Sequence, residues 1–562
     1  MSTWKLCLAL LTALLATLLG ACAGPAPRGT TPVAVKVLAI NDFHGNLKPP
    51  LGGVRIKDPA DPTKTINVAA GGAEHLATAV AQLRRKNPNH IFVAAGDLIG
   101  ASPLLSALFR DEPTIQSLSL MGLEASAVGN HEFDRGSAEL LRMQRGGCHP
   151  MDGCKGPEPF TGADFKYLAA STIDARTGRT LLPAYHVKHF EGIPVAFIGL
   201  TLKDTPTIVV PSGVKGLTFR DEAQTVNELV PQLRAQGIEA IVLLIHEGGW
   251  PSGDYNECPG ISGPIVDIVK KLDKAVDLVV SGHTHRAYNC RIDGRLVTSA
   301  DKFGTIVTEI DLVLDPRNGD VVSAAADNLI VRNDKFAKDA AQTQLIAAYE
   351  QLSAPLARRV VARLNGALTR DENPAGETRI GQVVADAQLA ATRTAADGGA
   401  QLALMNPGGL RAALSPQLDA QGQGEVRYED LFAVQPFYNN LVTLSLSGAE
   451  LLHVLEQQWL NQPRPRILQV SNGFAYTWDA ARPAGQRVVP GSVLLDGSLL
   501  EVNANYRVTV NSFLAAGGDN FHTLKLGRDA RTGMMDVDAF EQYLARNANL
   551  PAAAPPRITR LN

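Results

Sequence analysis

Five short clusters of side chains that commonly bind metals occur in the first half of this 562-residue chain, each after an apolar run. They are Asp42-Phe43-His44, Gly96-Asp97, Gly129-Asn130-His131-Glu132-Phe133-Asp134, His246 and Gly282-His283-Thr284-His285. Two divalent ions a few ångströms apart can clamp both the attacking and the leaving oxygen of a displacement at phosphorus. Such a pair needs imidazole and oxygen ligands with one bridging carboxylate. A single cluster is more often a turn or a cap, but the combination predicts a two-metal phosphoesterase site.

The apolar runs before these clusters have the composition of buried parallel strands. VAVKVLAI comes before Asp42, HIFVAAG before Asp97, EAIVLLI before His246 and AVDLVVSG before His283. All are short and rich in Val, Ile and Leu, as strands buried on both faces are. Because the carboxyl ends of parallel strands face one crevice, we expect the clusters to meet there.

Two more motifs, NPGGLR at 406–411 and GGDNF at 517–521, lie in the second half of the chain. Together with DFHG, GD, GNHEFD, HEGG and GHTH in this order, they make the chain resemble the bacterial and animal 5'-nucleotidase family, which includes UDP-sugar hydrolases. Members join a calcineurin-like metallophosphoesterase domain to a nucleotide-binding C-terminal domain. The resemblance implies an α/β fold, with a four-layer α/β/β/α metallophosphoesterase sandwich followed by a second α/β nucleotide-binding domain.

The resemblance also implies a role for each side chain of the five clusters. Asp42, His44 and His285 would hold one metal, Asn130, His246 and His283 would hold the other, and Asp97 would bridge the two. The cofactors would be two divalent ions of Zn, Mn, Co or Fe. A shared carboxylate keeps the ions close, while neutral imidazoles leave enough positive charge to acidify a bound water. Relatives often have Gln in place of His285, which bears on metal preference.

His131 and Asp134 are predicted to form a catalytic dyad. His131 follows the ligand Asn130 and can reach the phosphoryl oxygens or the leaving group, while Asp134 can hold its other ring nitrogen in one tautomer. The alternative is that Asp134 only caps a helix that begins near Arg135.

The second half carries the residues that the family uses to bind its substrate. By resemblance these are Asn406 for the base, Arg370 and Arg411 for phosphate, Phe437 and Phe513 for stacking on the base, and Asp519 for the ribose hydroxyls. Arg379, where relatives mostly have a small or neutral residue, is a reserve candidate, and Pro407 replaces a family glycine. Aromatic stacking tolerates every base, so broad base specificity is expected. A phenylalanine taken alone is more often a residue of the hydrophobic core than a surface on which a base stacks.

Length and composition favour two domains. A chain of this length with 45% apolar residues is too long for one core. The predicted organisation is a catalytic domain over 33–332, a connecting helix over 333–364 that breaks near Pro355, and a substrate-binding domain over 365–562. Relatives carry substrate between the domains by rotating around this helix. The formal net charge of -3 gives no footprint for a nucleic-acid polymer, and no protein partner is implied.

Residues 1–21 are predicted to be a lipoprotein signal peptide, followed by a tether over 22–32. Lys5 precedes an apolar stretch too short to span a bilayer comfortably, and the motif LGAC ending at Cys22 resembles a bacterial lipobox. Lipidation of Cys22 would anchor the exported protein on the periplasmic side, and Ala23 after it points to the outer membrane. An ordinary secretory signal, which would release a soluble periplasmic protein, is the alternative.

Four further cysteines are consistent with an oxidising compartment. Cys148 and Cys154 lie close together in CHPMDGC and can close a small ring, which leaves Cys258 to pair with Cys290. A zinc site built from all four thiolates is the alternative, but the spacings lack a CxxC.

The sequence and the resemblance together predict an exported enzyme of nucleotide catabolism that releases nucleoside and inorganic phosphate from nucleotides. Two rivals share the motifs: a 2',3'-cyclic-nucleotide 2'-phosphodiesterase/3'-nucleotidase, and a UDP-sugar diphosphate hydrolase with a roomier phosphate pocket. A nucleotide-binding receptor without catalysis is the alternative outside enzymes, and the intact His131 and Asp134 argue against it.

Overall fold

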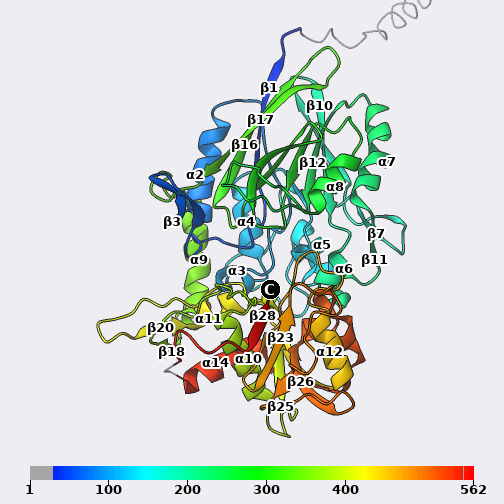
Figure 1. The fold of residues 1–562 in the computed structure, drawn as a ribbon. Coiled ribbons are helices and arrows are strands. Elements are labelled where there is room, and N and C mark those ends of the chain that lie inside the picture. The colour runs from blue at the N-terminus through cyan, green and yellow to red at the C-terminus, as the bar shows by residue number, and fades with distance from the viewer. Residues whose placement is uncertain (1–29, 548–549) are drawn as a thin grey trace, which may run out of the picture.

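The computed structural model describes residues 30–547 and 550–562. The predicted signal peptide and the lipidation site Cys22 lie outside the described residues. The described chain forms two parts, drawn from blue to green and from yellow-green to red (Figure 1). Helix α9 (Ala340–Ala357) lies between them in the sequence. Within the described part of the chain, no helix is both long and apolar enough to cross a membrane.

Two six-stranded sheets form the centre of the first part. The first sheet has the order β17 (Val321–Ile330), β16 (Ile306–Leu314), β1 (Val33–Ile40), β4 (His90–Ala94), β5 (Ala125–Ala127), β6 (Lys166–Leu168). The second has the order β14 (Ala287–Ile292), β15 (Arg295–Ala300), β13 (Leu278–Ser281), β12 (Ala240–His246), β10 (Ile193–Thr201), β9 (Tyr185–Phe190). The strands that carry the motifs run parallel to one another: β1 to β4 and β4 to β5 in the first sheet, and β12 to β13 in the second, where β10 is also parallel to β12. On its other side β1 pairs with β16 in the antiparallel direction.

Helices cover the outer faces of both sheets. They are α2 (Ala73–Arg84), α4 (Glu112–Leu120) and α5 (Ser137–Arg145) on the first sheet, and α7 (Glu222–Arg234) and α8 (Pro264–Lys271) on the second. Successive residues of β1 point to opposite faces, so Leu38 packs against the helices and Val37 against the other sheet. A separate hydrophobic core fills each of the three spaces between layers. The predicted α/β/β/α sandwich is confirmed.

Smaller elements complete the first part around the sandwich. They are β2 (Val54–Asp58), β3 (Asp61–Val68), β7 (Thr172–Asp174), β8 (Arg179–Thr180), β11 (Leu217–Phe219), α3 (Leu104–Ala107), α6 (Thr205–Ile208), η1 (His131–Phe133) and η2 (Pro211–Val214).

Helix α9 is shorter than the helix expected over 333–364. It is not broken at Pro355, which lies inside it, and Val360–Leu364 at the end of that range form strand β18. The helix packs on the first part, where the side-chain amide of Gln342 donates to the carbonyl of Ser117 and Ile346 enters the core.

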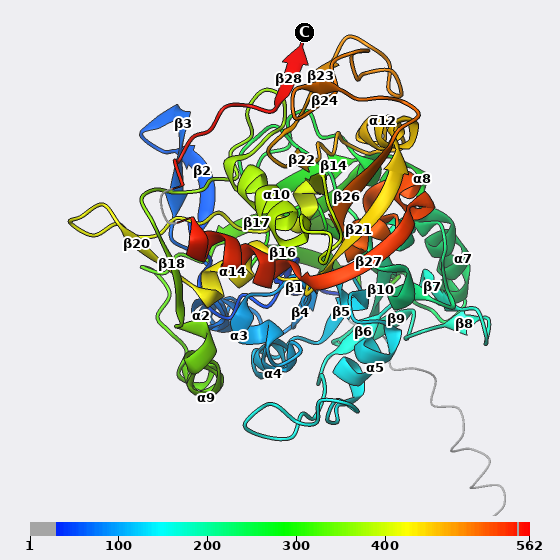
Figure 2. The ribbon, with the colours of Figure 1, turned by 90° about the horizontal axis from the view of Figure 1, so that it is seen from below.

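The second part contains a mixed five-stranded sheet of order β22 (Gln469–Val470), β19 (Leu402–Met405), β26 (Asn505–Asn511), β21 (Asn440–Ser447), β27 (Arg528–Met535). Helices α10 (Arg379–Thr392) and α14 (Asp536–Arg546) pack against each other beside this sheet (Figure 2). The other elements are β18, β20 (Gly424–Arg427), β23 (Phe474–Asp479), β24 (Leu494–Leu495), β25 (Ser498–Leu499), β28 (Ile558–Leu561), α11 (Tyr428–Val434), α12 (Gly448–Glu456), α13 (Ser512–Ala515), η3 (Pro407–Gly409), η4 (Gly518–Asn520) and η5 (His522–Leu526).

Both expected disulfides are present. Cys148 is bonded to Cys154, and Cys258 is bonded to Cys290. The second bond ties the loop after β12 to strand β14, next to the predicted metal site. The four thiolates therefore do not form a zinc site.

Candidate active site

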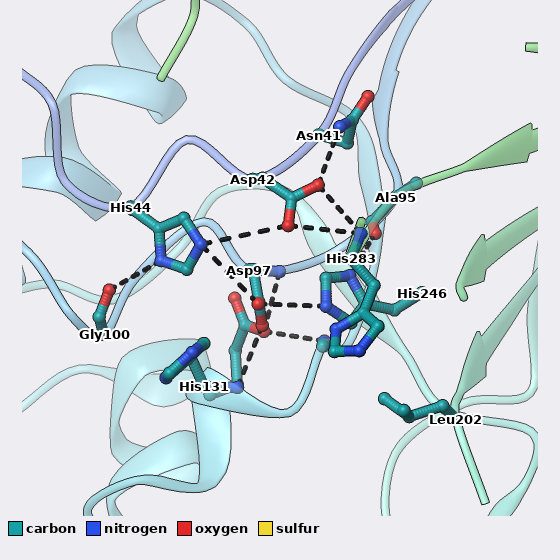
Figure 3. Close-up of polar contacts among 12 residues, drawn as sticks. Asn41, Asp42, His44, Ala95, Asp97, Gly100, His131, Leu202, His246 and His283 are labelled. Atoms are coloured by element: carbon teal, nitrogen blue, oxygen red, sulfur yellow. Dashed lines mark hydrogen bonds and ion pairs between the residues drawn. The ribbon is translucent and has the colours of Figure 1, made fainter. Parts of the chain in front are cut away.

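All five clusters lie at the carboxyl ends of strands in the two sheets. β1 ends just before Asp42, β4 before Asp97, β12 at His246 and β13 before His283. The fifth cluster, around Asn130, follows β5. The side chains converge on Asp97 (Figure 3). The expectation that these clusters meet in one crevice is correct.

The backbone at these positions is unusual. Five of the seven expected ligands have φ between 45° and 70°: Asp42, His44, Asp97, His283 and His285. This left-handed region is uncommon for residues other than glycine, and it is retained mostly at functional sites where the surrounding structure enforces it. The turns after the strands thus aim the side chains inward.

Hydrogen bonds to backbone carbonyls set the tautomers of two histidines. His44 donates from Nδ1 to the carbonyl of Gly100 at 2.8 Å, and His246 donates from Nδ1 to the carbonyl of Ala95 at 2.7 Å. A carbonyl only accepts, so each imidazole keeps the Nε2 lone pair for the centre of the site. The Nε2 atoms of His44 and His285 lie only 3.1 Å apart.

The geometry fits two divalent ions. The nitrogen and oxygen atoms of Asp42, His44 and His285 lie within 4.8 Å of one another, and so do those of Asp97, His246 and His283. The buried side-chain atoms without a hydrogen-bond partner include two of this site, Oδ1 of Asn130 and Nε2 of His246. Buried polar atoms are normally paired, so these orphaned electron pairs fit a cation.

The pKa values of the histidines favour metal binding. Burial lowers the pKa of His44 and His285 well below the usual range and that of His283 to about 4, so these rings are neutral. Burial also lowers the pKa of His246, but the charge of Asp97 raises it to about 10. Nε2 of His246 lies 2.9 Å from Oδ2 of Asp97.

His131 and Asp134 form the expected pair. Nδ1 of His131 lies 2.7 Å from Oδ2 of Asp134, and its backbone N–H donates to Oδ1 of Asp97. Burial lowers the pKa of His131, but Asp134 and Asp97 raise it above its usual value. Helix α5 has Gly136 as its N-cap and no side-chain cap, so Asp134 does not serve as a helix cap.

Glu132, which the sequence analysis did not single out, holds two site loops together. Its buried carboxylate accepts backbone N–H groups of Asp97, Leu98 and Gly129 at 3.0, 2.8 and 2.6 Å. These N–H groups belong to the loops after β4 and β5, which carry the proposed ligands Asp97 and Asn130. Burial and the charge of Asp97 raise the pKa of Glu132 to about 8 against the effect of these donors. Its place inside GNHEFD was the available sequence signal.

We expect Glu132→Ala to destabilise the protein by about 3 kcal/mol or more, because three buried N–H groups lose their acceptor. Glu132→Gln, which keeps one oxygen acceptor, should lose less. Urea unfolding monitored by circular dichroism measures both. Equal unfolding midpoints for wild type and Glu132→Ala would show that these hydrogen bonds do not stabilise the loops.

A cavity of about 300 Å³ joins the two parts of the chain. Its wall from the first part includes Asn130, His131 and His283, and its wall from the second part includes Asn406, Arg411, Phe437, Phe513 and Asp519. The ring of Phe437 stacks on His131 with centroids 6.0 Å apart. The structure thus brings most of the expected substrate residues to the metal site.

Two of the expected arginines do not line this cavity. Arg370 lines a second cavity and donates from Nη1 to the carbonyl of Arg411 at 3.0 Å. Arg379 begins α10 and donates to the carbonyl of Pro551, so the reserve candidate is not part of the site.

A further arginine was missed by the sequence analysis. Arg466 lines the cavity of about 300 Å³ and forms an ion pair with Asp519. The other carboxylate oxygen of Asp519 accepts a hydrogen bond from the side-chain amide of Asn406 at 2.8 Å. No motif marks Arg466, since only the fold brings it to Asp519.

The two parts match two family models. The first matches the calcineurin-like phosphoesterase model over residues 35–287. The second matches the model of the 5'-nucleotidase C-terminal domain over residues 360–526.

Individual relatives agree with this pair of domains. The chain is 31% identical to the endonuclease YhcR of Bacillus subtilis over 93% of its own length, but it spans only 41% of that longer protein. It is also 31% identical to the cell wall protein Lmo0130 of Listeria monocytogenes, with 91% of this chain and 67% of that one covered. The crystal structure of a 5'-nucleotidase precursor from Thermus thermophilus has a TM-score of 0.76 and 27% identity, covering 94% of this chain and 100% of that one. The chain therefore belongs to the family that joins a calcineurin-like phosphoesterase domain to a 5'-nucleotidase C-terminal domain.

Proposed function

We propose that this protein is a metal-dependent 5'-nucleotidase that releases nucleoside and inorganic phosphate. The observation that carries this proposal is the shared cavity, which has metal-ligand residues on one wall and two phenylalanines with Asp519 on the other. Arg411 also lines this cavity, with its guanidinium carbon 5.9 Å from the ring centroid of Phe437, and it would bind the phosphate joined to the nucleoside. The similarity to the Thermus 5'-nucleotidase precursor supports the same activity.

The catalytic roles follow from the donor set. One divalent ion would be held by Asp42, His44 and His285, the other by Asn130, His246 and His283, and Asp97 would bridge them. When bound, the ions supply an acidified water and neutralise charge on the phosphoryl group. The expected identities remain Zn, Mn, Co or Fe.

His131 and Arg411 act on the substrate itself. Asp134 accepts the Nδ1 proton of His131, and Asp134 and Asp97 raise the pKa of the ring. In the protonated form Nε2 also carries a proton, which would be donated to a phosphoryl oxygen or to the departing ribose oxygen. The guanidinium of Arg411 is suited to bidentate contact with phosphate oxygens. Both groups stabilise the charge that develops in the transition state.

The nucleoside would be bound by the second part. Phe437 and Phe513 would stack on the base, Asn406 would contact its edge and Asp519 would accept from the ribose hydroxyls. A side chain at Gly518 would collide with the ring of Phe513, since a Cβ there would lie only 2.4 Å from its Cζ. This glycine therefore leaves space for the stacking ring.

A phosphate-release assay tests the activity directly. The substrates are AMP, ADP, ATP, UDP-glucose, 3'-AMP and cyclic 2',3'-AMP, each with Zn, Mn or Co. Fastest turnover of a 5'-monophosphate supports the proposal. Preference for cyclic 2',3'-AMP or for UDP-glucose would favour one of the rival hydrolases, and tight nucleotide binding without turnover would favour a receptor.

We also propose export to the periplasmic side, with lipid attachment at Cys22 and anchoring in the outer membrane. The two disulfides support an oxidising compartment. Intact mass of the purified membrane form should show a lipid-modified N-terminal cysteine. The unmodified mass of a chain cleaved nearby would indicate ordinary secretion instead.

We further propose that residues 33–332 and 365–562 act as catalytic and substrate-binding domains that move apart to release product. Because α9 packs on the first part, the hinge would lie at its C-terminal end, near Ala357. In the present structure α6 of the first part contacts η4 of the second, so the cavity is closed on this side.

A disulfide engineered between one cysteine in α6 and one in η4 should stop turnover, since the locked domains neither admit substrate nor release product. Mild reduction should restore the rate. The two single-cysteine variants, oxidised in the same way, are the control. Turnover at the normal rate by enzyme that mass spectrometry shows to be fully cross-linked would exclude domain motion from the cycle.

A further inference from the structure

The carboxylate proposed to accept hydrogen bonds from the ribose, that of Asp519, is almost fully buried. Its side chain is only 5% exposed, and the residue lines the cavity of about 300 Å³. Burial of a carboxylate without a cation or hydrogen-bond donors favours its protonated form. A protonated carboxyl accepts fewer hydrogen bonds than an ionised one. The use of Asp519 as an acceptor therefore requires a partner that keeps it ionised.

Arg466 is this partner. Its Nη1 donates to Oδ1 of Asp519, and within the described part of the chain no other Lys or Arg forms an ion pair with this carboxylate. Burial lowers the pKa of Arg466 to about 10, so its guanidinium stays charged at neutral pH. The other oxygen, Oδ2, accepts from Asn406 at 2.8 Å. Each oxygen of Asp519 thus has one of these donors and keeps a second lone pair, which matches the two neighbouring hydroxyls of a ribose.

The loop that carries Arg466 is tied to the loop that carries Asp519. Gln462 donates from Nε2 to the carbonyl of Asp519 at 2.6 Å. In the opposite direction, Asn520 donates from Nδ2 to the carbonyl of Asn461 at 3.0 Å. Asp519 itself has φ 56°, a conformation that is retained where the surrounding structure enforces it. The guanidinium and the carboxylate are therefore held in register before a nucleoside binds.

A second arginine of the same loop has different surroundings. Arg464 lies two residues before Arg466, and its guanidinium carbon is 5.3 Å from the ring centroid of Trp250 in the first part. It lines the second cavity, not the one that contains Asp519. Of these two arginines, only Arg466 reaches the wall that would bind the nucleoside, and Arg464 offers a matched control.

We propose that Arg466 is a positioning residue for ribose recognition, which holds Asp519 ionised and oriented so that its remaining lone pairs accept from the 2'- and 3'-hydroxyls. The inference rests on the proposed nucleotide hydrolysis and adds a specificity to it, namely that ribonucleotides are preferred to nucleotides without these hydroxyls. Arg466 acts through Asp519 and not on the phosphoryl group. Its contribution is therefore to substrate binding.

The kinetic test compares AMP with 2',3'-dideoxy-AMP, which has no hydroxyl for Asp519 to accept from. We expect Arg466→Ala to raise KM for AMP by about 10-fold or more, the size of a hydrogen bond to a charged group, and to leave kcat within about 2-fold. For the dideoxy substrate KM should change by less than about 2-fold, because the contact supported by Arg466 is absent. Arg466→Lys, which keeps the charge, should recover part of the AMP affinity.

Three further variants separate ribose recognition from general damage. Arg464→Ala should leave the ratio of kcat/KM for the two substrates within about 2-fold of wild type. In an Asp519→Ala background, adding Arg466→Ala should change KM for AMP by less than about 2-fold, because its partner is already missing. Arg466→Gln, which keeps an amide donor without the charge, replaces Arg466→Ala if circular dichroism shows that the alanine variant does not fold. An unchanged KM for AMP, or an equal rise for both substrates, would overturn the proposal.

Binding of nucleosides separates failure of this inference from failure of the proposed function. Calorimetry gives the affinities of wild type and Arg466→Ala for adenosine and for 2',3'-dideoxyadenosine. Weaker binding of adenosine alone by the variant supports the positioning role even if AMP is not hydrolysed. Equal adenosine affinities would exclude it while leaving 5'-nucleotidase activity intact, and tighter binding by the variant would mean that Arg466 obstructs Asp519. A wild type that does not distinguish the two nucleosides would also exclude it.

Discussion

Replacing Asp97 by alanine is expected to abolish both metal retention and phosphate release. Its carboxylate lies between the two ligand groups, 2.9 Å from Nε2 of His246 and 3.7 Å from Nε2 of His44. Removing it would leave two like-charged ions with no shared ligand. Metal content by mass spectrometry and phosphate release are measured on the same preparation.

A second variant separates charge from structure at this position. Oδ1 of Asp97 also accepts the backbone N–H of His131, so alanine removes a hydrogen bond as well as a ligand. Asp97→Asn keeps an oxygen acceptor without the negative charge, and it should also be inactive while retaining the wild-type circular dichroism spectrum. Near-normal turnover by either variant would rule out the two-metal assignment.

His131→Ala is expected to lower kcat by about 100-fold or more while both metals stay bound. The substitution removes a donor to the phosphoryl group but none of the proposed ligands. Asp134→Asn should cause a smaller loss, because the ring keeps its position but loses the carboxylate that supports its charge. Steady-state kinetics with metal analysis measure both variants.

The matched control is His189→Ala, since His189 lies in β9 on the edge of the second sheet, away from the site. It should leave kcat unchanged. Loss of one metal equivalent in His131→Ala would mean that His131 is itself a ligand, which would invalidate its assignment as a donor to the substrate.

Much of the site could be predicted from the sequence because its signals are local. Short apolar strands before Asp42, Asp97, His246 and His283 place these residues at strand ends, and parallel strands bring their carboxyl ends together. The alternation of faces along such strands also follows from the chain itself. The pair Cys148–Cys154 is also local, and Cys258–Cys290 was named as the pair that remained.

Other parts depend on contacts between distant segments. The connecting helix ends at Ala357 instead of extending to 364. The reason is that Val360–Leu364 form strand β18, which pairs with the distant strand β20 (Gly424–Arg427). Arg379 was a reasonable phosphate candidate by type, but the position of α10 directs it to Pro551. Local sequence does not encode either outcome.

The sequence by itself determined which side chains could bind metals, and it placed them at the ends of strands. Only the tertiary structure showed that Glu132 joins two loops and that Arg466 reaches Asp519. The physical reason is the range of the interactions. Strand formation depends on neighbouring residues, whereas a hydrogen bond or an electrostatic field in a cavity depends on which distant segments the packed sheets and domains bring together.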